Sequence, residues 1–124
     1  MILEEICTYE VCKLAKEKGF PVKEIECWYC EYDGHPTKEI IDEQQHPIIT
    51  QSLLQRWLRE EKGVTICADI YDDGWFFDIS TFYQQDTGVY EVDILYKSSN
   101  VTPVYPTYEL ALEDALKYAL ENLV

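Results

Sequence analysis

The sequence predicts an α+β domain of two layers, in which about three helices pack on one face of a three-stranded antiparallel meander. The pattern also allows a fourth strand in this sheet. Three segments place apolar residues at helical spacing behind a threonine, and three β-rich runs separated by turn residues lie between the second and third of them. The 124 residues amount to one domain, so residues 1–124 are expected to share a single core.

Each helix is predicted from its first and last residues and from its apolar stripe. Thr8 is the expected N-cap of a helix over residues 9–18, which Gly19 ends. Thr50 and Thr107 are the expected N-caps of the second and third helices. The stripes of these two helices consist of Leu53, Leu54, Trp57 and Leu58, and of Leu112, Ala115, Leu116, Ala119 and Leu123.

The strands are predicted over residues 64–71, 75–83 and 89–96, where aromatic and β-branched residues are frequent. Asp72-Asp73-Gly74 and residues 84–88 supply the turns between them. Between the first two helices the pattern is mixed, and it predicts a single strand within residues 25–32 followed by a loop to Pro47.

The turn lengths predict the register of both hairpins. A two-residue turn at Asp73-Gly74 and a four-residue loop at 85–88 place one apolar set on the same face, which the helices are expected to cover. That set is Ile66, Ala68, Ile70, Phe77, Ile79, Val92 and Ile94. The predicted cross-strand pairs are Tyr71–Phe76, Ile70–Phe77, Asp69–Asp78 and Ala68–Ile79, then Tyr83–Tyr90, Thr81–Val92, Ile79–Ile94 and Phe77–Tyr96.

The opposite face of this sheet is predicted to be acidic. Residues 64–96 carry seven acidic side chains and no Lys or Arg, and the register gathers Asp69, Asp78, Glu91 and Asp93 on one side. Such a face can bind a hard cation through oxygen ligands, here Asp69, Asp78 and Asp93, or dock a basic protein surface. A solvated face with no ligand is the structural alternative.

Cys27 and Cys30 have the spacing of half a zinc site, and His35 and His46 follow them. A second cysteine pair is missing from the sequence, so two cysteines on a partly buried strand are the competing interpretation. The odd number of cysteines, five, favours free thiols in a reducing compartment, and the expected location is cytoplasmic.

Composition restricts the possible partners. The net charge of −14 and the pI near 4.3 argue against direct binding to nucleic acid, which needs clustered Lys and Arg. The sequence has no apolar run long enough to span a membrane and no basic, apolar leader at its start. It also lacks the phosphate-loop, nucleophile-elbow and zinc-protease motifs, so we expect no enzyme and no cofactor.

The segments YEVCKLAKEKGF (residues 9–20), TQSLLQRWLREE (50–61) and TYELALEDALKYALENL (107–123) resemble the helices of a group of small proteins from bacterial, phage and mobile-element genomes. No activity is established for that group. The resemblance implies a small intracellular accessory protein and transfers no site residue.

The leading functional hypothesis is a non-enzymatic interaction module whose partner is another protein or a second copy of the chain. Two alternatives remain open at this point. An acidic mimic of nucleic acid would occupy a DNA-binding protein with carboxylates spread over one elongated face. A metal-binding protein would use Cys27 and Cys30 for zinc, or the aspartates for a hard cation.

Overall fold

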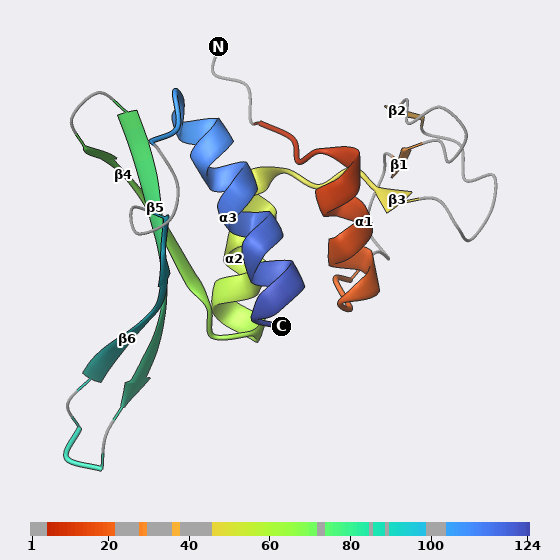
Figure 1. Ribbon diagram of the computed structural model, residues 1–124. Coiled ribbons are helices and arrows are strands. Elements are labelled where there is room, and N and C mark those ends of the chain that lie inside the picture. The colour runs from red at the N-terminus through yellow and green to blue at the C-terminus, as the bar shows by residue number, and fades with distance from the viewer. Residues whose placement is uncertain are drawn as a thin grey trace.

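The computed structural model describes residues 5–21, 28–29, 36–37, 46–71, 74–84, 86–88, 90–98 and 104–124. It confirms the α+β fold, with three helices and a three-stranded antiparallel meander among these residues (Figure 1).

The helices are α1 (Tyr9–Glu17), α2 (Gln51–Glu61) and α3 (Tyr108–Asn122). Each begins after the predicted threonine, whose hydroxyl accepts a hydrogen bond from a backbone N–H in the first turn. One detail of the α2 stripe was wrong, because Leu53 is 43% exposed and Gln51 is buried in the interior.

The meander consists of β4 (Thr65–Tyr71), β5 (Gly74–Gln84) and β6 (Tyr90–Lys97), with β5 in the centre. A second, minimal sheet has the order β2-β1-β3 and is formed by β1 (Trp28–Tyr29), β2 (Pro36–Thr37) and β3 (His46–Pro47). The sequence predicted one strand in that region, and the two additional strands are too short to leave an alternating pattern.

Helix α3 lies across the meander and also contacts α1 and α2, so it joins the helical layer to the sheet (Figure 1). Apolar residues of all three helices and of β4 and β5 meet around it. The largest fully buried side chains of this core include Val11, Ile49, Leu54, Leu58, Phe77, Ile79, Leu116 and Leu120.

The predicted register of the β4–β5 hairpin was wrong by two residues. Tyr71 pairs with Gly74, so Gly74 belongs to the strand and is not a turn residue as predicted. A Cβ on Gly74 would lie 2.7 Å from a methyl carbon of Val104 and 2.8 Å from the carbonyl oxygen of Tyr105. The glycine is therefore needed for close approach of the chain at 104–105, which pairs with the start of β5, and not for the turn.

The predicted register of the β5–β6 hairpin was also wrong. Gln84 pairs with Tyr90, so five residues and not four separate the paired ends. Nearer the helices the pairing shifts again, because Ile79 faces Tyr96 while Ser80 faces Ile94, and Leu95 is the extra residue of a β-bulge. Because of this bulge, the alternation of inner and outer residues in the outer half of β6 is reversed relative to the half near the helices.

We call the side of the sheet toward α3 the inner face and the opposite side the outer face. The predicted face holds for β4 and β5, and Ile66, Phe77 and Ile79 are buried there. Ile70 also lies on the inner face, but the helices do not cover it as predicted, because it is 60% exposed. The predicted face is wrong for Val92 and Ile94, which pair with Phe82 and Ser80 on the outer face and are 51% and 54% exposed. This end of the hairpin extends past the helices, so no core fixed its register (Figure 1).

Candidate functional site

The structure divides the four predicted acidic residues between the two faces of the sheet. Asp69 and Asp78 lie on the outer face as expected. Glu91 and Asp93 pair with Tyr83 and Thr81, which places them on the inner side, in the part of the hairpin beyond α3. The single four-carboxylate face that the sequence predicted is therefore absent.

Asp69 and Asp78 do not face each other, in contrast to the predicted pair. Asp69 lies opposite Phe76, and Asp78 lies opposite Cys67 on one side and Lys97 on the other. The exposed Asp69 uses Oδ1 to accept a hydrogen bond from the N–H of Ile70 at 2.8 Å. The two-residue change in register thus removes the repulsion between directly opposed carboxylates.

Asp78 carries the uncompensated charge of the outer face. Its Oδ1 is inaccessible to solvent and accepts no hydrogen bond from the described residues. Lys97 is the cross-strand neighbour, yet the two side chains do not form an ion pair among the salt bridges of the described chain. A buried acceptor without a donor costs about 1–3 kcal/mol, and more when it is charged.

Apolar side chains lie on the same outer face. Val92 and Ile94 are more than half exposed, and the bulged Leu95 beside them is 42% exposed. Phe76, on the neighbouring strand, is partly buried. The described helices lie on the inner side only (Figure 1). On the outer face, Ile94 pairs with Ser80, one outer position along β5 from Asp78, and Val92 pairs with Phe82, two outer positions away. The exposed side chains form an apolar surface that begins beside Asp78.

The predicted zinc site cannot be placed. Cys27, Cys30 and His35 lie outside the described residues, so this hypothesis stays a prediction. Within the described ranges, no group of three His, Cys, Asp or Glu side chains has the arrangement of a metal site. Of the described cysteines, Cys67 is exposed on the outer face, whereas Cys7 and Cys12 are buried in the core.

Cys7 and Cys12 form a buried pair of thiols beside the start of α1. The thiol of Cys12 lies 3.8 Å from the carbonyl oxygen of Cys7. The interaction of Cys7 with the Cys12 side chain, together with burial, raises the pKa of Cys7 far above its ordinary value. The same interaction lowers the pKa of Cys12. Both side chains are fully buried and pack as small groups inside the core.

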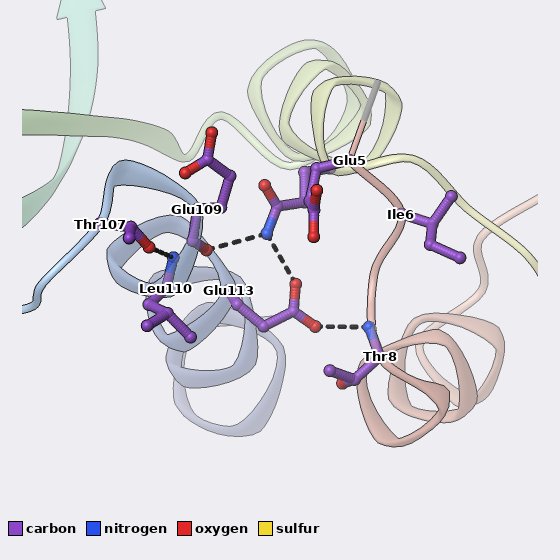
Figure 2. Close-up of a pocket in the computed structure, with 8 residues that line it drawn as sticks. Glu5, Ile6, Thr8, Thr107, Glu109, Leu110 and Glu113 are labelled. Atoms are coloured by element: carbon purple, nitrogen blue, oxygen red, sulfur yellow. Dashed lines mark hydrogen bonds between the residues drawn. The ribbon is translucent and has the colours of Figure 1, made fainter. Parts of the chain in front are cut away.

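Glu113 joins the N-terminal ends of all three helices. Its carboxylate accepts the N–H of Thr8 at 2.6 Å and the side-chain amide of Gln51 at 2.8 Å (Figure 2). The same amide donates to the carbonyl oxygen of Glu109 at 3.0 Å. A cavity of about 300 Å³ lies beside this network, and the polar groups of the network bond to one another. We therefore assign a structural role to this network and not a binding role.

A second cavity, of about 220 Å³, lies between the inner face and α3. Its rings come from Phe77, Tyr96, Tyr105 and Tyr118. Tyr96 and Tyr118 are stacked with 3.9 Å between ring centroids, and Phe77 lies 5.6 Å from Tyr96 and 5.9 Å from Tyr105. We call this cavity the aromatic pocket. Burial is the main cause of a raised pKa at Tyr96.

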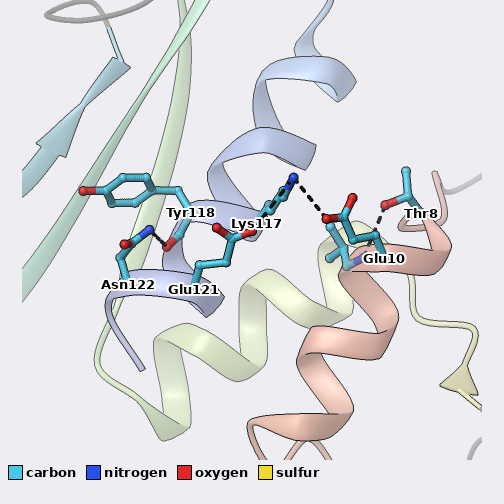
Figure 3. Close-up of polar contacts among 7 residues, drawn as sticks. Thr8, Glu10, Lys117, Tyr118, Glu121 and Asn122 are labelled. Carbon is cyan, nitrogen blue, oxygen red and sulfur yellow. Dashed lines mark hydrogen bonds and ion pairs between the residues drawn. The ribbon is translucent and has the colours of Figure 1, made fainter.

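Charged side chains of α3 form the rim of the aromatic pocket. Asp114 accepts a hydrogen bond from the hydroxyl of Tyr105, and Glu121 lies one helical turn beyond Lys117. Lys117 is held by Glu10 of α1 at 3.2 Å and by Glu121 at 3.9 Å (Figure 3). Sequence reasoning missed this pocket, because its residues come from four separate segments and follow no short motif.

Comparison with protein-family models, with curated proteins and with solved structures gave no match. Among the helices that the structure describes, none is both long and apolar enough to cross a bilayer.

Proposed function

We propose that this chain is a non-enzymatic interaction module that binds a basic protein through the outer face of its β4–β5–β6 sheet. The observation that carries the proposal is the position of Asp78, an unpaired carboxylate next to exposed apolar side chains on a sheet face that the described helices leave open. A partner that presents Lys or Arg within an apolar surface would complement both features.

Charge argues for a basic partner over a second copy of the chain. The protein carries 24 acidic and 10 basic residues, so two copies repel each other at long range. Two outer faces in contact would also bring together the carboxylates of Asp69 and Asp78 from each copy. Dimerisation through this face would therefore bring four carboxylates together against only the two ammonium groups of Lys97.

The division of the acidic residues weakens two of the alternatives, the nucleic-acid mimic and the hard-cation site. A nucleic-acid mimic needs carboxylates along one elongated face, and a hard-cation site at Asp69, Asp78 and Asp93 needs them together. The register places Asp93 on the side of the sheet opposite the other two. Docking of a basic protein needs only the outer residues, and it is the function that we favour.

The proposal can be tested by NMR titration with a short peptide of alternating lysine and leucine. We expect amide shifts that concentrate on β5 and β6 at the outer face. The double variant Val92→Ser/Ile94→Ser and the single variant Asp78→Asn should each weaken binding by at least about fivefold, equivalent to roughly 1 kcal/mol. Native mass spectrometry of the free protein should show a monomer.

The matched control is Leu53→Ser/Leu110→Ser, which removes two exposed leucines from the helices and should leave the affinity unchanged. Shifts scattered over the whole acidic surface, with equal affinity in all variants, would show non-specific charge attraction and overturn the proposal. A dimer that Val92→Ser/Ile94→Ser dissociates would replace the basic partner by a second copy.

A further inference from the structure

We infer that the aromatic pocket binds the guanidinium group of an arginine side chain from a partner protein. This site lies between the inner face and α3, on the side of the sheet away from Asp78, and the inference does not depend on the outer face. Three features carry it: the rings that form the pocket, the sign of the charge around it, and a lysine that already occupies part of its rim.

The rings provide a surface for a weakly hydrated cation. Phe77 is 2% exposed, and its ring is a neighbour of the rings of Tyr96 and Tyr105. Tyr118, which stacks on Tyr96, extends from α3 toward the sheet (Figure 3). Electron-rich ring faces attract cations placed within about 6 Å of the centroid. The planar guanidinium group can in addition stack on a tyrosine ring.

The charges around the pocket favour a cation over an anion. Asp114, Glu121 and Glu10 carry three negative charges, against one positive charge on Lys117. The ammonium of Lys117 bonds to Glu10 and Glu121, and Asp114 has no ion-pair partner among the described residues. The hydroxyl of Tyr105 donates to Oδ2 of Asp114, so Oδ1 remains able to accept from a ligand.

The position of Lys117 argues for guanidinium over ammonium as the ligand. A compact ammonium group requires several acceptors around it, and the two carboxylates that could supply them at this rim already hold Lys117. Glu10 and Glu121 share their charge with Lys117, so the remaining space offers ring surface and the carboxylate of Asp114, which no described cation neutralises. An arginine side chain matches that combination, because its head group is planar, weakly hydrated and rich in N–H donors.

The test is a titration with N-acetyl-arginine amide, followed by NMR of both ligand and protein. We expect upfield shifts of the ligand's δ-methylene protons, caused by the rings, and amide shifts around Tyr96, Tyr105 and Tyr118. N-acetyl-lysine amide should bind at least about fivefold more weakly.

Two substitutions on the rim should change the affinity in opposite directions. Asp114→Asn retains an acceptor for Tyr105 but removes the charge, and should weaken arginine binding by at least about fivefold. Lys117→Met removes the like charge and should strengthen it by about two- to fivefold. Glu109→Gln makes the same change of charge as Asp114→Asn, in the first turn of α3 away from the pocket, and should leave the affinity unchanged.

Each contrary result overturns the inference. Equal affinity for the lysine and arginine amides would show a general cation site. Weaker binding in Lys117→Met would show that Lys117 supports the ligand and does not repel it, which contradicts the charge argument. If neither amide causes ring-current shifts while circular dichroism confirms a folded protein, the pocket has no role in binding cations.

Discussion

Glu113 shows how one side chain can fix the relative positions of three helices. It belongs to α3, accepts the backbone N–H that precedes α1, and accepts the amide of Gln51 at the start of α2 (Figure 2). Gln51 is only 4% exposed, so its amide would lose a charged acceptor inside the protein if Glu113 were removed. Hydrogen bonds to charged groups contribute about 1.5–3 kcal/mol each, more than neutral ones.

We therefore predict that Glu113→Ala lowers the free energy of unfolding by about 2–3 kcal/mol, measured by urea denaturation. Glu113→Gln should lose less, because the remaining amide oxygen can still accept one of the two hydrogen bonds. Glu109→Ala is the control, since its exposed carboxylate forms no hydrogen bond in the described structure and only its backbone oxygen contacts Gln51. Equal stability of Glu113→Ala and Glu109→Ala would contradict the structural role.

At the scale of elements, local signals were sufficient for the helices and insufficient for the register of the strands. A threonine cap and an apolar stripe lie within a few residues of each other, and all three helices begin where the sequence predicts. Register depends on loop length and on contacts that are distant in sequence. Val104 and Tyr105 require Gly74 in the strand, and a bulge at Leu95 reverses β6; no turn residue reveals either feature.

The placement of the candidate site residues depended on the same strand registers. Asp69 and Asp78 were placed on the correct face because a two-residue change of register preserves the alternation of faces. Glu91 and Asp93 were placed on the wrong face because a one-residue change reverses it. The aromatic pocket could not have been predicted, since it depends on how α3 crosses the sheet.

A comparison of two isoleucines tests the observed register. The predicted pairing placed Ile79 and Ile94 together in the core, whereas the structure buries Ile79 completely and leaves Ile94 54% exposed. We expect Ile79→Ala to cost about 2–5 kcal/mol, because it creates a cavity, and Ile94→Ala to cost less than about 1 kcal/mol. Urea denaturation of both variants measures this difference. Comparable losses would restore the four-residue loop and with it the single acidic face.

At the scale of the whole molecule, a well-packed core supports a chain whose charges oppose folding. Twenty-four acidic residues against ten basic ones leave a net charge of −14, and the ion pairs described, such as Arg56–Glu60 and Lys117–Glu10, are exposed. Exposed pairs contribute about 0–1 kcal/mol each, so they do not offset the mutual repulsion. The same net negative charge keeps copies of the chain apart and attracts basic partners, which connects the composition to the proposed function.

Screening should therefore stabilise the protein, and the identity of the salt should not matter. Raising NaCl from about 0.01 M to about 0.15 M shortens the Debye length from about 30 Å to about 8 Å, and we expect the free energy of unfolding to rise by roughly 1 kcal/mol or more. MgCl2 and CaCl2 at the same ionic strength should give the same increase in protein first treated with a chelator. A larger increase with either divalent salt would mean that a bound cation stabilises the folded state by an amount that depends on its affinity and concentration, and the hard-cation alternative would then be favoured over the interaction module. The variants Asp78→Asn and Asp93→Asn would then show which face of the sheet holds the ion. The two carboxylates lie on opposite faces, so one ion does not bind both.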